Sequence, residues 1–444
     1  MSGGLAIRGA KVQMGIESRL QDGSAVFGVV GLGYVGLPLL VEMAKSGHRV
    51  VGLEISAEKV ADINAGRSYI PDVPASVIAD LVGKGLLEAT CDFSRASECD
   101  AIAICVPTPL DEMKEPDTSY MESAARMIAP HLHEGVLVTL ESTTYPGTTE
   151  EIVQPILETS GLTVGDGLSL AFSPERVDPG NAHFQTRNTP KVVGGVTPRC
   201  TKEAVAFYSC FIDTIVPVSS TRAAEMTKLL ENIFRCVNIA LMNELLQVSE
   251  RMGINIWEVV DAAKTKPFGF MPFQPGPGLG GHCIPIDPFY LAWKARQFDM
   301  HTEFIELAGK TNEAMPYYVV QRLMNALNNH RKSLAGSRIL VLGVAYKADI
   351  DDMRESPAIK IAGLLRERQA DVVYHDPYVE RFEAEGGEVT SVALSAEEIG
   401  KADAVLLITD HSNVDYGLVV RSAQLVLDTR NALRAFADDK VVRL

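Results

Sequence analysis

The sequence predicts an α/β protein with two Rossmann-like parallel-sheet domains joined by a central helical domain that contains one long helix. Short apolar runs alternate with helix-like segments from residue 25 to about residue 217, and the alternation begins again at residue 337. Strands that alternate with helices form βαβ units and mainly parallel sheets. Between the two regions, residues 221–252 contain neither Pro nor Gly and predict the long helix.

Composition and charge limit the possible classes of function. A chain of 444 residues is too long for one ordinary domain, and 46% hydrophobic with 22% charged residues is usual for a globular α/β protein. A net charge of -16 argues against nucleic-acid binding, because a polyanion would be repelled. We find no signal-peptide pattern and no apolar run of about 18 residues, so we expect no membrane span.

The cysteines indicate a reducing environment. There are seven, and none forms a CxxC pair, so neither a disulfide framework nor a zinc cluster fits. We therefore expect a cytoplasmic location and no bound metal.

The first α/β domain is expected to cover residues 25–217. It follows an N-terminal extension, residues 1–24, that is either poorly ordered or a short helical arm. A helix is expected at residues 37–46. Apolar runs predict strands at residues 25–30, 49–55, 100–106, 135–140, 169–173 and 191–195.

The central helical domain is expected at residues 218–330 and the second α/β domain at residues 331–444. After the long helix we expect a helix at 256–263 and a loop rich in Gly and Pro at 266–288. A further helical stretch should run to about Asn328, with Pro316 marking a new start or a kink. Strands of the second domain are expected at residues 338–342, 370–374, 404–408 and 425–427.

A glycine-rich fingerprint follows the first predicted strand and opens a helix. Gly31 would make the tight turn, Gly33 would let the backbone approach a pyrophosphate, and Gly36 would let helix and strand pack closely. Tyr34 and Val35 lie in the same turn, whose helix N-terminus suits phosphate. A glycine-rich turn without a ligand is the alternative interpretation.

The next strand ends in Glu54, at the distance where an acid binds the adenosine ribose hydroxyls. The same acid would repel a 2′-phosphate, so NAD is favoured over NADP. Lys59 is either a cofactor contact or a solvated surface lysine. Pro107 and Thr108 follow another strand, at the edge where Rossmann folds bind ligands.

Cys283 is the candidate nucleophile. It lies in Gly278-Leu279-Gly280-Gly281-His282-Cys283-Ile284-Pro285-Ile286-Asp287, where the glycines allow close approach of a ligand and an acid follows. A thiolate is the reactive form and needs an electropositive surrounding or a base. A buried, inert cysteine in a loop is the alternative.

Seven motifs in order resemble the UDP-glucose/GDP-mannose dehydrogenase family over residues 25–435. They are GLGYVGLP at 31–38, CVPTP at 105–109, ESTTYPGTT at 141–149, SPER at 173–176, Lys228 with Asn232, GLGGHCIP at 278–285 and GVAYKADIDDMRESP at 343–357. The resemblance implies oxidation of a sugar C6 alcohol to a carboxylate in two hydride transfers, with two NAD per turnover. It also implies that the second α/β domain binds the UDP-sugar.

The resemblance implies catalytic roles for six residues. Cys283 would add to the C6 aldehyde as a thiohemiacetal, which the second hydride transfer converts to a thioester. Lys228 would stabilise the oxyanion, and it shares a helix face with Asn232, four residues on. The remaining roles are those of Asn232 and Asp287 in polarising water or alkoxide, Glu175 in thioester hydrolysis, and Thr143 in holding a water near the nicotinamide.

Further binding residues follow from the same resemblance. Tyr346, Lys347 and Arg430 match contacts to the UDP-sugar, and Arg354 matches a residue near NAD; a surface charge is the alternative for the basic residues. We expect His282 to be a spacer or a sugar contact, not a base. The substrate set is completed by Glu175, Arg176, Lys228, Asn232, Gly278, Gly280 and Gly281. The long helix is expected to form a homodimer interface, as in the family.

Three departures concern the substrate. Ile286 stands where many UDP-glucose members have Lys, Pro179 where many have a second Glu, and Glu141 where many have Lys. These departures resemble the branch that oxidises UDP-2-acetamido sugars, so the expected substrate is UDP-N-acetylglucosamine. UDP-N-acetylmannosamine and UDP-glucose remain alternatives.

Two other classes of function fit parts of the sequence. A one-step β-hydroxyacid dehydrogenase also has a Rossmann domain and a helix with Lys-x3-Asn, but it needs neither the cysteine nor a second α/β domain. A nucleotide-sugar or NAD sensor would keep the fold without turnover. The intact set of Lys228, Asn232, Cys283 and Asp287 argues against a sensor.

Overall fold

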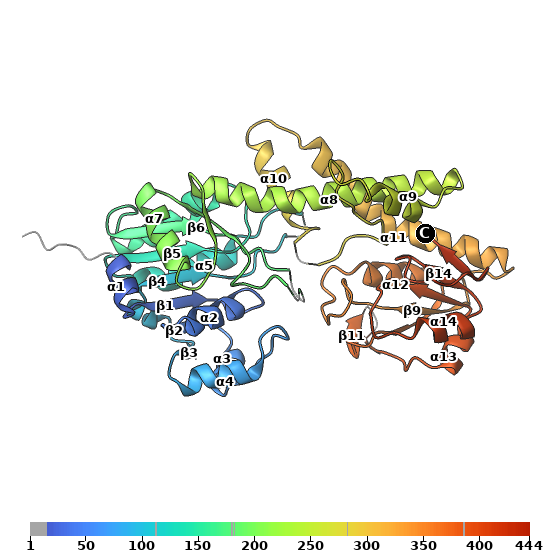
Figure 1. Ribbon diagram of the computed structural model, residues 1–444, viewed down its shortest axis with the longest axis horizontal. Helices are drawn as coiled ribbons and strands as arrows, with labels where there is room; N and C mark the ends of the chain where they lie inside the picture. The colour runs from blue at the N-terminus through green and yellow to red at the C-terminus, as the bar shows by residue number, and fades with distance from the viewer. Residues whose placement is uncertain (1–15, 112, 179–180, 182, 282, 385–386) are drawn as a thin grey trace, which may run out of the picture. The chain divides into compact units, whose positions relative to one another are not determined.

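The computed structural model describes residues 16–444 except 112, 179–180, 182, 282 and 385–386. The chain forms two compact units that divide between Leu229 and Leu230, inside one long helix (Figure 1). Each unit has its own mainly parallel sheet, so the predicted fold class is confirmed. Among the residues that the structure describes, no helix is long and apolar enough to cross a membrane.

The first unit contains an eight-stranded sheet in the order β3-β2-β1-β4-β5-β6-β7-β8. All neighbours are parallel except β6 and β7, which are antiparallel. Its elements are α1 Ile16–Asp22, β1 Val26–Val30, α2 Gly36–Lys45, β2 Arg49–Leu53, α3 Ala57–Asn64, α4 Ala75–Gly83, β3 Leu87–Thr90, β4 Ala101–Ile104, α5 Ser119–Ile128, β5 Val136–Leu140, α6 Gln154–Leu157, β6 Leu168–Phe172, β7 Lys191–Gly195, α7 Pro198–Tyr208 and β8 Ile215–Pro217.

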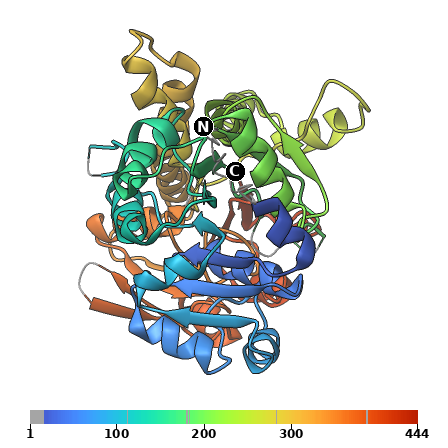
Figure 2. The same cartoon turned by 90° about the vertical axis from the view of Figure 1, so that its left-hand side faces the viewer.

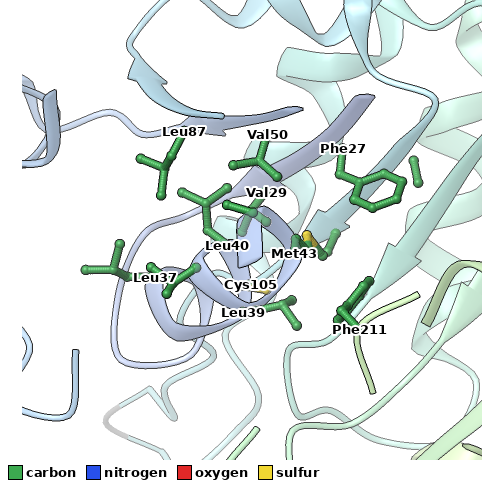
Figure 3. Packing of buried hydrophobic residues seen from close by; sticks show 14 of the residues in the cluster. Phe27, Val29, Leu37, Leu39, Leu40, Met43, Val50, Leu87, Cys105 and Phe211 are labelled. Carbon is green, nitrogen blue, oxygen red and sulfur yellow. The ribbon is translucent and has the colours of Figure 1, made fainter. Parts of the chain in front are cut away.

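Both faces of this sheet are covered, as Figure 2 shows with the first unit toward the viewer. Alternate side chains of β1 enter different cores: Phe27 and Val29 join one cluster, and Val30 joins the other. In Figure 3, Leu40 and Met43 of α2 lie against Val29 of β1. This packing fixes the beginning of α2 at the end of β1, where the glycine fingerprint lies.

The N-terminal helix α1 is packed against the first unit. Ile16 is buried in the same core as α2, and Arg19 forms an ion pair with Asp100 at the start of β4. Of the two expectations for residues 1–24, a short helical arm therefore holds for α1, and residues 1–15 lie outside the described chain.

The second unit contains the helical region and a five-stranded parallel sheet in the order β10-β9-β13-β14-β15. The long helix α8, Thr221–Arg251, begins in the first unit and continues into the second. The other elements are α9 Ile256–Ala263, α10 Asp287–Arg296, α11 Glu303–Asn329, β9 Arg338–Leu342, α12 Pro357–Glu367, β10 Asp371–His375, β11 Arg381–Ala384, β12 Gly387–Thr390, α13 Ala396–Lys401, β13 Ala404–Leu407, α14 Tyr416–Ser422, β14 Val426–Asp428 and β15 Val441–Arg443.

Pro316 does not begin a new helix, so that part of the prediction was wrong. Helix α11 is continuous from Glu303 through Pro316, and the break lies earlier, where Asp299 has a left-handed φ of 56°. A helical proline leaves the carbonyl four residues before it, here that of Asn312, without its usual donor. The backbone at Gly278 crosses α11 at this place, because a Cβ there would lie 3.4 Å from Pro316 and 3.6 Å from the Asn312 oxygen.

Candidate active site

The glycine turn after β1 requires glycine at two positions for packing. Gly31 has φ 86°, and its N–H donates to the carbonyl of Leu53 at the end of β2. A Cβ on Gly36 would lie 1.9 Å from the Gly31 oxygen, so helix α2 can approach β1 only without a side chain there. These two positions have the roles that the fingerprint predicts for them, the tight turn and the close packing.

Gly33 is different, because no protein atom lies within 4 Å of a Cβ built on it. Protein packing therefore does not explain glycine at this position. Val35 precedes α2 and makes no side-chain cap. The N–H of Leu37 donates to the carbonyl of Gly33 and Pro38 has no N–H, so Gly36 supplies the helix N–H that lacks a side-chain acceptor. Open space beside a helix N-terminus fits the pyrophosphate of NAD.

Glu54 is fixed at the edge of this turn. It is 5% exposed, and its two oxygens accept the N–H groups of Leu32, at 2.9 Å, and Ser56, at 3.1 Å. The ammonium of Lys59 lies 3.7 Å from the same carboxylate. Lys59 therefore lies beside the acid expected to bind the ribose, with its side chain 41% exposed.

The ends of β4 and β5 bring the predicted Pro107, Thr108 and Thr143 to one edge of the sheet. The Ser142 hydroxyl donates to the carbonyl of Val106 at 2.7 Å, which ties the two strand ends together. Thr108 is buried, Thr143 is half-buried and Pro107 is exposed. This is the edge where Rossmann folds bind ligands.

The loop after Thr143 is anchored to helix α8 by a buried acid, Glu225. Its carboxylate accepts the N–H of Gly147 at 2.6 Å and both the N–H and the hydroxyl of Thr149. Burial raises the pKa of Glu225, although these hydrogen bonds act in the opposite direction. Lys228 lies one turn further along the same helix.

Lys228 is buried and lacks a partner among the described residues. It is 8% exposed, and no hydrogen-bond acceptor or carboxylate from that part of the chain lies in reach of its ammonium. Its ammonium nitrogen is not fully enclosed by protein, so it is accessible to an anionic ligand, which would supply the counter-charge. Lys228 is therefore suited to bind an anion or to stabilise a negative charge that develops on a ligand.

Glu175 lies in a second buried polar cluster of the first unit. Its Oε1 accepts the N–H groups of Arg176 and Val177, both at 2.7 Å. Its Oε2 is 3.8 Å from the ammonium of Lys191, which also binds Glu141 at 2.6 Å. Leu140 at the end of β5 pairs with Phe172 at the end of β6. Thr143 comes three residues after Leu140, and Glu175 comes three residues after Phe172.

The second unit holds Asn232, Cys283 and Asp287 together. Asn232 of α8 donates directly to the Asp287 carboxylate, and both residues are buried. The Cys283 carbonyl accepts the N–H groups of Ile286 and Asp287, so Cys283 begins the turn that leads into α10. A nucleophilic thiolate requires an electropositive surrounding, and the N-terminal end of the α10 dipole lies on this side of the helix.

Residues from the second sheet pack on the glycines of the Cys283 loop. A Cβ would lie 2.7 Å from the Arg430 guanidinium at Gly276, and 2.6 and 2.8 Å from Tyr346 at Gly280 and Gly281. The N–H of Gly281 also donates to the carbonyl of Arg354 at 3.0 Å. Two residues predicted to bind the substrate, Tyr346 and Arg430, therefore pack on the loop that contains Cys283.

The other predicted basic residues have distinct places. The Arg354 guanidinium pairs with Asp352 at 2.6 Å, and Lys347 follows Tyr346 as a half-buried side chain. Arg430 donates to the carbonyl of Ile408 at 2.8 Å, and burial lowers its pKa. Arg430 also lines a cavity of about 250 Å³ with Trp257, Asp261, Gln274, Pro275, Asp410, Asn431 and Arg434.

Some expectations concern residues with little or no description. His282 and Pro179 lie outside the described residues. All seven cysteines are free thiols, and burial raises the pKa of Cys105 well above its usual value. Among the described residues, no group of three or more His, Cys, Asp or Glu side chains could hold a metal ion.

These sites contain residues that were not predicted from the sequence, and Lys191, Glu225 and Gln274 are examples. Lys191 opens an otherwise apolar strand, and a charge in such a strand was an available signal. Glu225 lies three residues before Lys228 on the helix, which is also visible in the sequence. Gln274 lines the cavity from the loop rich in Gly and Pro, where no pattern marks it.

Comparison with known families gives three matches that together cover most of the chain. The NAD binding domain of the UDP-glucose/GDP-mannose dehydrogenase family matches residues 25–212. The central domain of that family matches residues 222–314, and its UDP binding domain matches residues 340–435.

Individual relatives are similar over nearly the whole chain. The NDP-N-acetyl-D-galactosaminuronic acid dehydrogenase of Ralstonia solanacearum is 37% identical over 90% of this chain and 95% of its own. The UDP-N-acetyl-D-glucosamine 6-dehydrogenase of Pseudomonas aeruginosa is 37% identical over 86% of this chain and 90% of its own. The solved UDP-D-ManNAc dehydrogenase of Pyrococcus horikoshii has a TM-score of 0.86 at 33% identity, covering 94% of this chain and 98% of its own.

Proposed function

Because the chain belongs to the UDP-glucose/GDP-mannose dehydrogenase family, we propose that it oxidises the C6 alcohol of UDP-N-acetylglucosamine to a carboxylate in two NAD-dependent steps. The family itself supports NAD-dependent oxidation of a UDP-sugar at C6. The observation that carries the two-step chemistry is the turn from Cys283 to Asp287, which Asn232 binds and which precedes helix α10.

In the first step, the C6 hydroxyl loses its proton and a hydride, and an aldehyde results. NAD, when bound, accepts the hydride, and the turn at Gly31–Gly36 with Glu54 would hold it. The buried Lys228 would stabilise negative charge on the C6 oxygen. The Asn232–Asp287 pair would orient the proton that leaves or the water that receives it.

In the second step, the Cys283 thiolate adds to the aldehyde carbon and forms a thiohemiacetal. Loss of a second hydride from C6 and of the hydroxyl proton converts this adduct to a thioester, and a second NAD, when bound, would supply the hydride acceptor. Water hydrolyses the thioester with release of the thiol. Glu175 would take the proton of that water, because its carboxylate is held by two backbone N–H groups and remains partly exposed. Covalent capture keeps the aldehyde from leaving the site.

The substrate is the finer part of the proposal. The relatives described above act, by name, on N-acetylated sugars, which supports a UDP-2-acetamido sugar. Ile286 and Glu141, which distinguish this chain from many UDP-glucose members, support the same class. UDP-N-acetylmannosamine, UDP-N-acetylgalactosamine and UDP-glucose are the competing substrates.

The same proposal includes a homodimer formed through helix α8. Apolar side chains recur on one stripe of this helix at intervals of three, four and seven residues. They are exposed in the single chain: Met226, Leu230, Phe234, Leu241, Leu245, Val248 and, one residue past the end of the helix, Met252. Sedimentation of the purified protein at micromolar concentration tests the dimer, and a monomer there would refute it.

A substrate panel tests the activity. Purified enzyme is given NAD with UDP-N-acetylglucosamine, UDP-N-acetylmannosamine, UDP-N-acetylgalactosamine, UDP-glucose and UDP-galactose in turn, and NADH and product are quantified. We expect the highest kcat/KM with UDP-N-acetylglucosamine and two NADH per uronate. One NADH per sugar would contradict the two-step chemistry. Cys283→Ser should abolish net oxidation while NAD binding persists, and near-normal activity of that variant would exclude covalent catalysis.

A further inference from the structure

Lys191 is a buried lysine at the start of strand β7, next to the predicted catalytic acid. Its side chain is 5% exposed, and its ammonium donates to Glu141 at 2.6 Å and to the carbonyl of Pro174 at 3.4 Å. An ammonium has three N–H groups, so the third remains for a further acceptor. The Glu175 carboxylate, at 3.8 Å, is within ion-pair range.

The sheet places these residues opposite each other. In the antiparallel pair of β6 and β7, Ala171 pairs with Gly195 and Phe172 with Gly194. Continued by three residues, the same register puts Glu175 opposite Lys191. Glu175 lies three residues beyond the end of β6, so the register brings the two residues near each other and the side chains complete the approach to 3.8 Å.

The two oxygens of the Glu175 carboxylate have different neighbours. The N–H groups of Arg176 and Val177 bind Oε1, and Lys191 lies on the side of Oε2. The Glu175 side chain is 16% exposed, whereas that of Lys191 is 5% exposed. Lys191 therefore acts on Glu175 from inside the protein and leaves the carboxylate open to water.

Glu141 supplies the charge that allows a lysine to be buried here. It lies at the end of β5 and also accepts the hydroxyl of Tyr208 at 2.6 Å. Burial alone would lower the pKa of Lys191, but the neighbouring Glu141 and Glu175 raise it, so the ammonium stays protonated. Burial raises the pKa of Glu141, and its neighbours Lys191 and Tyr208 limit that effect.

We propose that Lys191 is a positioning residue for Glu175 in the hydrolysis of the thioester, and this rests on the function proposed above. In that step the oxygen of water bonds to the thioester carbon and one proton of the water passes to Glu175. The C–S bond breaks, and Cys283 leaves as a thiolate that regains a proton. The step is hydrolytic and needs no oxidant. Lys191 fixes the direction in which the Glu175 carboxylate accepts the proton.

A purely structural role for Lys191 makes a different prediction. If the lysine only joined the ends of β5, β6 and β7, its removal would weaken the fold or slow both hydride transfers alike. A positioning role affects the steps unequally: the release of NADH by the first turnover stays normal, and the acyl-enzyme accumulates. The two roles can therefore be separated by single-turnover kinetics.

The experiment compares four variants of the full-length enzyme. Lys191→Met leaves Glu141 buried without its counter-ion and can fail to fold, so Lys191→Met/Glu141→Gln removes both charges of the pair. Lys191→Arg keeps the positive charge as the conservative variant. Lys202→Met removes an exposed lysine of the same unit that pairs with Glu17, and serves as the matched control. Thermal unfolding by circular dichroism establishes that each variant is folded.

Each variant is mixed with NAD and UDP-N-acetylglucosamine, or the epimer that the panel selects, and is then acid-quenched. Intact-protein mass spectrometry measures the sugar thioester on Cys283, and absorbance measures NADH. For the double variant we expect thioester hydrolysis slowed about 10-fold or more, an unchanged burst of NADH, and acyl-enzyme accumulation. Lys191→Arg should recover most of the hydrolysis rate, and Lys202→Met should match the parent.

The outcomes decide between the roles. Hydrolysis at the parental rate in the double variant overturns the proposal, as does an equal slowing of the NADH burst and of hydrolysis. If the parent enzyme itself forms no adduct and releases one NADH per sugar, the proposed function fails before Lys191 is tested. Failure of the function and failure of the positioning role are thus distinguishable.

Discussion

The strands β1 and β9, one in each sheet, are followed by the same kind of glycine turn, but the two turns have different surroundings. Gly31 after β1 has φ 86°, and Gly343 after β9 has φ 79°. Each donates its N–H to the last residue of the neighbouring strand, Leu53 and His375 respectively. A Cβ on either glycine would lie too close to a backbone oxygen that follows the other neighbouring strand. The distance would be 2.8 Å from Gly31 to the Cys105 oxygen and 2.5 Å from Gly343 to the Thr409 oxygen.

The difference lies in the segment after the turn. In the first unit α2 begins at Gly36, whereas in the second α12 begins only at Pro357, after a segment that packs on the Cys283 loop. The acid at the end of the second strand differs too. Glu54 accepts two backbone N–H groups, but Asp376 accepts those of Val344, Ala345, Tyr378 and Val379 and also contacts His411. One turn keeps room for a ligand, and the other is filled by the protein.

Gly36→Ala should break the first turn and give the largest effect. Its new Cβ would lie 1.9 Å from the Gly31 oxygen, so α2 must move away from β1. We expect a loss of about 3 kcal/mol or more in the stability of the first unit. Both tryptophans, Trp257 and Trp293, lie in the second unit. Circular dichroism should therefore record an early transition that tryptophan fluorescence does not, and coincident transitions at the parental temperature would contradict this.

Asp376→Asn should damage the second turn instead. An amide offers one acceptor oxygen where the carboxylate has two, and its NH₂ would face backbone donors. We expect the free energy of unfolding of the second unit to fall by about 2 kcal/mol. Urea unfolding detected by tryptophan fluorescence measures this change. The affinity for NAD should stay at the parental value, and a variant that lost NAD binding while folded would refute the division between the turns.

Gly33→Ala should separate binding from folding within the first turn. A methyl group there meets no protein atom within 4 Å, so thermal stability should change by less than about 0.5 kcal/mol. The same methyl would occupy the space proposed for the pyrophosphate, so the Kd for NAD should rise about 10-fold or more. Isothermal titration measures the Kd. Unchanged NAD affinity would remove the main structural support for the site.

The smallest expected effect is a difference between the parent and Asp376→Asn in the pH dependence of unfolding. Burial alone would raise the pKa of Asp376, but hydrogen bonds from His411 and from backbone N–H groups outweigh it and hold the pKa below its ordinary value. A lowered folded pKa stabilises the unit above the unfolded pKa, and this stability is lost as pH falls through the folded value. Urea unfolding detected by tryptophan fluorescence should therefore show that the free energy of unfolding decreases as the pH falls. This decrease should be about 1 kcal/mol smaller in Asp376→Asn than in the parent. Equal acid dependence in the two proteins would contradict this.

Much of the fold could be predicted because its signals are local. Apolar runs bounded by Gly located strands such as Lys191–Gly195, and the absence of Pro and Gly located α8. Strand β3, Leu87–Thr90, was missed because only alternate residues are buried, and its sequence LEAT contains no apolar run. The antiparallel pairing of β6 and β7 could not be predicted either, because it depends on where the intervening loop returns.

The candidate site was predictable where family motifs are contiguous. Cys283, Asn232 and Asp287 were identified in this way, and the structure adds the hydrogen bond between the last two. The partners of Glu175 could not be predicted, since Glu141 and Lys191 are far from it in sequence and meet only through the sheet register. The roles of these residues remain predictions for the experiments above.

The unequal accessibility of the seven thiols makes Cys283, the proposed nucleophile, a target for chemical labelling. Cys99, Cys105, Cys200 and Cys236 are buried, and Cys210 is half-buried with a pKa that burial raises. Only Cys91 is exposed, and Cys283 is half-buried at its helix end. In a Cys91→Ser background, a small haloacetamide should therefore react first at Cys283. The rate of that alkylation, with and without UDP-sugar, would report occupancy of the reaction centre without any turnover.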